Sequence, residues 1–270
     1  MNDDFIVTAY VVIDEVMQAL GHQTHCLAHI SDAEVLTVAV VAARYFQNHH
    51  ERALQIVQRL GYLSGTLSTS RFNRRLHALG DWFRLILETL GALLAQGEAY
   101  IIDRLPVPAC RRARARRCRK VRGAAYCGYC AAKGEQCFGW RRHLVCTVGG
   151  VPVAFDLLPA SLHDLTPVHE LTSGLPAGAS ADGDKADNSR RDEASILADT
   201  AVRLVPIRQA NMQPNLWADT LALRAYRKAI ETLNSQLEAM GVQRLHARST
   251  AGVELKVQAS LLALACANAH

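Results

Sequence analysis

The chain has 270 residues, of which 50% are hydrophobic, and 30 Lys and Arg against 25 Asp and Glu give it a formal net charge of +5. This length allows one large domain or two small ones, and the hydrophobic fraction provides a substantial core. The modest positive charge is compatible with an anionic partner. No apolar run reaches the roughly 20 residues of a membrane-spanning helix, so a membrane partner is not expected. The apolar C-terminal stretch predicts a buried helix instead.

Eight cysteines would suggest disulfides in a secreted protein, but no signal-like segment precedes them. We therefore expect reduced thiols and a cytoplasmic location. Cys127 and Cys130 have the C-x-x-C spacing of zinc sites, with Cys118 and Cys137 nearby. Because a second C-x-x-C is missing, free thiols are favoured over a structural zinc.

Residues 1–98 predict a small all-helical domain, with helices over 5–20, 35–46, 51–60, 71–79 and 82–94. The capping-box pattern Ser31-Asp32-Ala33-Glu34 indicates the start of the second of these helices. A turn at Gly65 followed by a short basic helix resembles a helix-turn-helix reader. The DNA contacts expected there are Arg71, Asn73, Arg74 and Arg75. The alternative role for this domain is packing or dimerisation through the apolar helix 35–46.

Residues 99–270 predict a mixed α/β domain. Strands are expected over 100–103, 143–148, 151–158, 179–183 and 203–207. Gly149-Gly150 predicts a tight hairpin between the second and third strands. Helices are expected over 166–171, 192–202, 221–240 and 251–267.

Three acidic residues in this domain have the settings that a two-metal phosphoryl-transfer site requires. Asp103 ends the first strand, Asp184 follows a later strand, and Glu231 lies in the long helix 221–240. Converging carboxylates can hold paired divalent ions that clamp the attacking and leaving oxygens of a phosphodiester. The alternatives are turn-forming or helix-capping aspartates, and a surface ion pair between Glu231 and Arg227 four residues earlier.

Between the first two of these carboxylates lies an arginine-rich segment, residues 111–122. Its eight basic residues are Arg111, Arg112, Arg114, Arg116, Arg117, Arg119, Lys120 and Arg122. Such a segment favours DNA, because neutralised phosphates release their counterions. The alternative is a solvated, disordered loop.

Three motifs together resemble the insertion-sequence DDE transposases. Ile102-Asp103-Arg104-Leu105-Pro106 is similar to their first-aspartate motif, and Gly183-Asp184-Lys185-Ala186 to their second. Residues 227–237, beginning Arg227-Lys228-Ala229-Ile230-Glu231, are similar to their glutamate helix. Weaker similarities at 139–144, 150–153, 163–164 and 246–248 extend the resemblance over nearly all of 99–270. The bacterial family numbered nine-eighty-two is the most similar.

This resemblance implies an RNase H-like fold, with a mixed sheet flanked by helices. It implies catalysis by Asp103, Asp184 and Glu231 with Mg²⁺, for which Mn²⁺ can substitute. The implied reaction is cleavage and strand transfer at the element ends, and the implied partners are terminal repeats, target DNA and further copies of the chain. The protein would then be associated with the nucleoid. Lys185, Arg227 and Lys228, which lie within the motifs, are expected to contact DNA.

The chain departs from the family pattern at Cys137, Asp187 and Gln209. Asp182 is a rival to Asp184 as the second aspartate, but no lysine follows it. Two alternatives therefore remain open beside an active transposase. One is a decayed transposase that only binds DNA, and the other is a related nuclease that hydrolyses nucleic acid without strand transfer.

Overall fold

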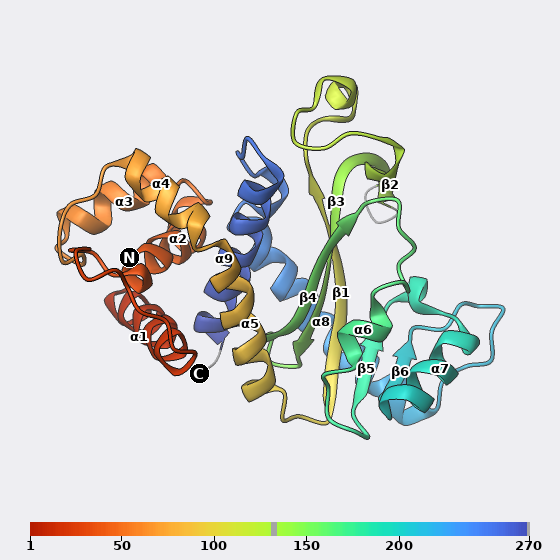
Figure 1. Ribbon diagram of the computed structural model, residues 1–270. Helices are drawn as coiled ribbons and strands as arrows, with labels where there is room; N and C mark the ends of the chain where they lie inside the picture. The colour runs from red at the N-terminus through yellow and green to blue at the C-terminus, as the bar shows by residue number, and fades with distance from the viewer. Residues whose placement is uncertain (131–133, 269–270) are drawn as a thin grey trace. The chain divides into compact units, whose positions relative to one another are not determined.

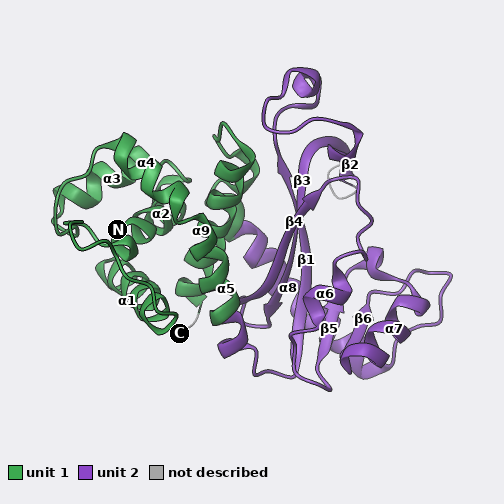
Figure 2. Cartoon of the chain, viewed as in Figure 1, with its two compact units in different colours: residues 1–89, 236–270 green, residues 90–235 purple. Residues whose placement is uncertain are grey.

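The computed structural model describes residues 1–130 and 134–268, and their packing divides them into two units (Figure 2). Unit 1 comprises Met1–Thr89 and the described residues from Gln236 onward, and unit 2 comprises Leu90–Ser235. This division differs from the boundary expected between residues 98 and 99. The described residues from Gln236 onward join unit 1 because the C-terminal helix packs against the N-terminal helices.

Unit 1 is built from helices. They are α1 (Asp3–Ala19), α2 (Asp32–Phe46), α3 (His50–Arg59), α4 (Thr69–Ala78), the first part of α5 (Gly80–Leu94), the short η4 (Val242–Arg244) and α9 (Thr250–Asn268). The predicted capping box is confirmed, since the Ser31 hydroxyl accepts from the Glu34 amide and the Glu34 carboxylate accepts from the Ser31 amide. The helix that it opens, α2, is buried along most of its length.

The central helices of unit 1 are held together by buried polar contacts as well as by apolar packing. The Asn48 side-chain amide donates to the Met240 carbonyl oxygen at 2.9 Å and to Ser260 Oγ at 3.0 Å. Among the described helices, α9 alone is long and apolar enough to cross a membrane, but most of its apolar window is buried within the protein. The expected buried C-terminal helix is thereby confirmed.

Unit 2 is organised around a mixed sheet (Figure 1). Its described strands are β1 (Ala99–Pro108), β2 (Cys127–Cys130), β3 (Glu135–Thr147), β4 (Pro152–Pro159), β5 (Ser180–Gly183) and β6 (Arg203–Pro206). The order is β2-β3-β1-β5-β6, with β4 also paired to β3. β1, β3 and β4 are antiparallel neighbours, whereas β5 and β6 continue from β1 in parallel.

Helices flank both faces of this sheet. α6 (Val168–Thr172) and α7 (Arg190–Thr200) lie beside β5 and β6 (Figure 1). Their apolar side chains join a core with residues from four strands: Tyr100, Ile102, Val145, Ala181 and Leu204. α8 (Trp217–Ala239) contacts the opposite face through Asn234. The mixed α/β class predicted from the sequence is confirmed.

β1 continues five residues beyond its predicted end, although it contains Pro106 and Pro108. The amide of Ala109 donates to β3, so the even-numbered residues before it direct their nitrogens to the other edge of β1. At that edge β5 pairs only with Ala99–Ile101. Proline has no amide hydrogen to donate. At these two positions that hydrogen would point to an edge of β1 where no strand lies to accept it, so the prolines cost the sheet no hydrogen bond.

Candidate active site

Asp103 lies in the middle of β1, on the face that α8 contacts through Asn234. Successive side chains of a strand point to opposite faces, and Tyr100 and Ile102 face the core under α6 and α7. The Asp103 side chain is 9% exposed, and both of its oxygens have partners within the protein. Arg142 Nη2 donates to Oδ2 at 2.5 Å, and Asn234 Nδ2 donates to Oδ1 at 3.2 Å.

The partner of Asp103, Arg142 on β3, is fully buried with an exposed fraction of 0%. Its register position opposite Leu105 places it on the same face of the sheet as Asp103. Arg142 Nε and Nη1 are buried and make no hydrogen bond with any described residue. The ion pair to Asp103 is thus the compensation that the fold provides for this buried cation.

Asp184 lies just beyond the end of β5 and caps the short helix η3 (Lys185–Asp187). Its Oδ1 accepts from the Ala186 amide at 2.7 Å and from Arg104 Nη1 at 3.1 Å. The side chain is 61% exposed, in contrast to that of Asp103. A Cβ on Gly183 would lie 2.4 Å from Asp187 Oδ2, so glycine is needed where the Asp187 carboxylate reaches back to the Asp184 amide.

Arg104 is surrounded by three carboxylates that belong to Asp164, Asp184 and Asp187. Asp164 also pairs with Arg141 of β3. Asp164 belongs to the weaker family similarity at 163–164, but the sequence gave no sign of the arginine at the centre. Asp187, noted as a departure from the family pattern, is fully buried beside this guanidinium.

His143 is the register neighbour of Arg104 on β3. It is buried, and neither ring nitrogen has a hydrogen-bond partner among the described residues. Burial, reinforced by the positive charge of Arg104, lowers the pKa of His143 to about 3. The imidazole is therefore neutral at physiological pH.

Glu231 lies on an exposed part of α8. Arg227 Nε donates to its Oε1 at 3.2 Å, and the Glu231 side chain is 65% exposed. This is the surface ion pair between positions i and i+4 that the sequence offered as an alternative. Asn234, three residues later, is the α8 side chain that contacts Asp103.

Asp182, the rival carboxylate on β5, is almost fully buried, and its Oδ2 has no hydrogen-bond partner. Its pairing with Ile101 places it on the Asp103 face of the sheet. Burial, with a smaller contribution from Asp219, raises the pKa of Asp182 to about 7, and Arg203 opposes this rise. Asp182 and Asp103 share this face, but no hydrogen bond joins them.

Each expected catalytic carboxylate thus has an arginine partner of its own: Arg142 for Asp103, Arg104 for Asp184 and Arg227 for Glu231. Within residues 1–130 and 134–268, no three His, Cys, Asp or Glu side chains form a group that could hold a metal ion. Carboxylate oxygens are ligands that suit Mg²⁺. In this arrangement, however, the three do not fit a bound ion, because they are paired separately and do not converge.

The arginine-rich segment forms a short 3₁₀ helix, η1 (Arg112–Arg117). Its arginines are exposed, as are Arg111, Arg119 and Arg122, while Cys118 and Val121 are buried and anchor the segment. On α4, Arg71 and Arg74 are exposed, whereas Arg75 pairs with Asp32. The structure therefore presents a concentrated basic surface at residues 111–122 and a smaller one on α4.

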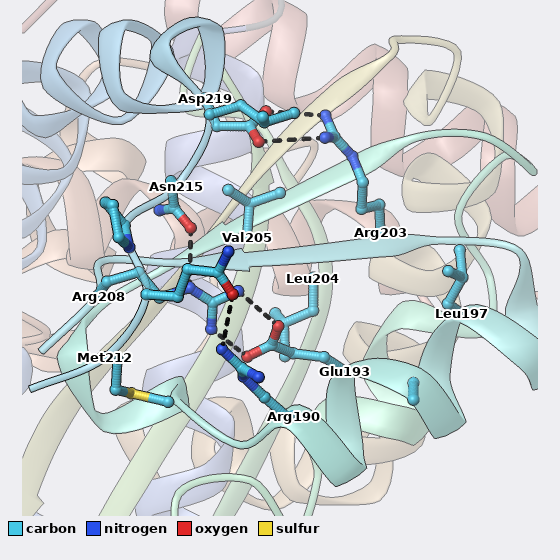
Figure 3. A pocket seen from close by; sticks show the side chains of 14 residues that line it. Arg190, Glu193, Leu197, Arg203, Leu204, Val205, Arg208, Met212, Asn215 and Asp219 are labelled. Carbon is cyan, nitrogen blue, oxygen red and sulfur yellow. Dashed lines mark hydrogen bonds and ion pairs between the residues drawn. The ribbon is translucent and has the colours of Figure 1, made fainter.

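A cavity of about 430 Å³ lies between α7, β6 and the start of α8 (Figure 3). Four of its five charged side chains form ion pairs with one another, and the fifth, Arg190, donates to Gln213 Oε1 at 3.1 Å. Arg208 donates to both carboxylate oxygens of Glu193, at 2.5 and 2.7 Å, and Arg203 pairs with Asp219 at 3.0 Å. These two ion pairs make most of the charged groups of the cavity part of the fold's own framework.

A model described as the transposase DDE domain matches residues 95–251. No curated protein and no solved structure gives a significant match.

Proposed function

Because the chain belongs to the transposase DDE domain family, we propose that it cuts DNA at the ends of an insertion sequence and joins the freed ends to target DNA. Both reactions are in-line phosphoryl transfers. The family indicates a DNA-cutting enzyme in general, and the finer assignment to the family numbered nine-eighty-two rests on the glutamate-helix motif.

The topology supports an RNase H-like fold for unit 2. β4, β3 and β1 are antiparallel neighbours, and β5 and β6 extend the sheet in parallel to β1. The long helix α8 follows β6 in the chain and contacts the sheet at Asp103. Because β1 and β5 are adjacent in this order, Asp103 lies on one of two neighbouring strands and Asp184 lies just beyond the end of the other.

We assign catalysis to Asp103, Asp184 and Glu231. The observation that carries this assignment is the contact between Asn234 of α8 and Asp103 of β1 at 3.2 Å. Residues three apart are neighbours on a helix surface, so Glu231 lies about one turn from the residue that contacts Asp103. Asp184 follows β5, the parallel neighbour of β1.

Mg²⁺, with Mn²⁺ as a substitute, is the cofactor that this chemistry calls for. The observed pairing with arginines does not fit a bound ion, so no step is derived through one. What the chain itself provides is a fixed carboxylate, Asp103, and two exposed ones, Asp184 and Glu231. Binding a shared ion would require the exposed carboxylates to leave Arg104 and Arg227.

The proposed DNA surface is the exposed basic segment 111–122, supported by Lys185 and Lys228 beside the catalytic positions. Exposed arginines bind phosphates through paired hydrogen bonds and release counterions on binding. The α4 arginines are a second contact, to the terminal repeats. A complex of several copies, associated with the nucleoid, would bring two element ends together.

A strand-transfer assay with a labelled element end and Mg²⁺ tests this proposal. The variants Asp103→Asn, Asp184→Asn and Glu231→Gln should lose product and keep DNA binding. Asp199→Asn, which changes an exposed aspartate of α7 paired with His169, is the matched control and should keep both. Equal transfer by all variants would overturn the assignment. A hydrolysed product alone would indicate a nuclease.

A DNA-binding protein without cleavage is the second candidate. The buried ion pair between Arg142 and Asp103 favours it, because this pair occupies a carboxylate that catalysis requires. Wild-type protein that binds the element end but yields no product at any Mg²⁺ concentration would establish this second function.

A further inference from the structure

Of the three arginines paired with proposed catalytic carboxylates, Arg142 alone is sealed from solvent. The Arg227 guanidinium is 76% exposed and can exchange its carboxylate for a phosphate. Arg104 has two further carboxylate partners, so it stays compensated when Asp184 leaves. Arg142 is 0% exposed, and its Nε and Nη1 have no other partner. A DNA phosphate cannot reach it, and no other anionic group of the described chain replaces Asp103.

We propose that Arg142 is a built-in counter-ion that holds Asp103 and keeps divalent ions from binding tightly to this carboxylate. The inference rests on the proposed function, which makes Asp103 a metal ligand. It adds a positioning residue on β3 that acts through Asp103 and touches neither DNA nor the reacting phosphate.

Charge explains why the pair would weaken metal binding. Arg142 occupies Oδ2 of Asp103, so an ion could approach only Oδ1. That oxygen accepts from Asn234, a neutral amide that can be displaced at small cost. The ion would then be separated from the guanidinium by little more than the width of one carboxylate. Repulsion between two cations at such a distance is strong in a poorly solvated site.

Geometry also explains why the counter-ion stays in place. At Arg142, β3 is paired with β1 on one edge, where Leu105 lies opposite, and with β4 on the other, where Leu157 lies opposite. The Arg142 backbone is therefore fixed opposite Leu105, and its side chain is 0% exposed. Any ion that approached Asp103 would be limited to Oδ1, because Arg142 occupies Oδ2.

The test is a Mn²⁺ titration of the full chain without DNA, followed by electron paramagnetic resonance of the free ion. Arg142→Met removes the charge and keeps the length of the side chain. We expect it to raise Mn²⁺ affinity at least tenfold, and the double variant Arg142→Met/Asp103→Asn to lose this gain. Arg203→Met, which removes another paired arginine of the same sheet, should leave Mn²⁺ affinity unchanged.

A second comparison needs no change at Arg142 and so remains valid if Arg142→Met does not fold. Because wild-type Asp103 contributes little to metal binding, Asp103→Asn should change Mn²⁺ affinity by less than twofold. A tenfold loss in Asp103→Asn would overturn the proposal, as would equal affinities of wild type and folded Arg142→Met. If either occurs while Asp103→Asn still abolishes strand transfer, the proposed function stands and only the counter-ion role fails. If Asp103→Asn transfers strands normally, the proposed function fails instead.

Discussion

Replacing Asp103 by alanine should destabilise the protein as well as inactivate it, because Arg142 would become a buried cation without a partner. Breaking a buried ion pair by removing one partner costs about 3–5 kcal/mol. The full burial of Arg142 and the 2.5 Å contact place Asp103→Ala in that range. Asp103→Asn keeps an acceptor oxygen, so its cost should be nearer to the roughly 1.5–3 kcal/mol of a charged hydrogen bond.

The double variant Asp103→Ala/Arg142→Met provides the decisive comparison. If the pair is compensated only by its two members, removing both should cost less than the sum of the two single variants, with a coupling of about 2–3 kcal/mol. Urea unfolding gives the free energies, and hydrogen exchange in peptides from β1 and β3 localises them. Strictly additive single-variant costs would refute the reasoning, since they would show that Arg142 does not depend on Asp103.

Three further predictions concern the exposed carboxylate, the basic segment and the buried histidine. Glu231→Gln should abolish strand transfer but change the free energy of unfolding by less than about 0.5 kcal/mol, because the ion pair between Glu231 and Arg227 is solvent-exposed. Thermal unfolding checks the stability, and the transfer assay checks the activity. The double variant Arg116→Gln/Arg117→Gln should reduce the slope of log affinity against log salt by about 1–2, and an unchanged slope in fluorescence anisotropy would exclude these arginines as phosphate contacts. Burial lowers the pKa of His143 to about 3, so the wild type should lose stability as pH falls from about 6.5 towards 3, because the unfolded chain takes up the proton first. The loss in unfolding free energy is at most about 5 kcal/mol, and His143→Phe should remove this pH dependence from urea unfolding.

Much of the fold follows from local patterns in the sequence. Helical periodicity predicted the position of every long described helix, and the capping box at Ser31 predicted the start of α2. Gly149-Gly150 predicted the β3–β4 hairpin. The prolines at 106 and 108 concealed the length of β1, since their tolerance depends on an edge that β5 does not reach. β2 was not predicted because its four residues carry no clear alternation.

The candidate site was predictable in its residue types but only in part in its pairing. The motifs identify Asp103, Asp184 and Glu231 as acidic groups near strand ends and on a helix. Whether Arg142 meets Asp103, 39 residues away, depends on the register of β1 against β3. A shift of one residue would turn Arg142 to the other face of the sheet. No local pattern contains that information, so Arg142 could be found only from the structure, whereas the i,i+4 spacing had already suggested Arg227 as the partner of Glu231.

The alternation of β1 sets a condition on how the proposed site would assemble. Asp103 and Arg104 are consecutive, so they face opposite sides of the sheet, and Asp184 bonds to Arg104. A common ion would therefore require the Asp184 carboxylate to leave Arg104 and turn towards the face that Asn234 of α8 contacts. Asp184 is exposed and lies beyond the end of β5, whereas Asp103 is fixed by a buried arginine. Assembly must then proceed by movement of Asp184 and Glu231 towards Asp103, with DNA phosphates taking over the exposed Arg227.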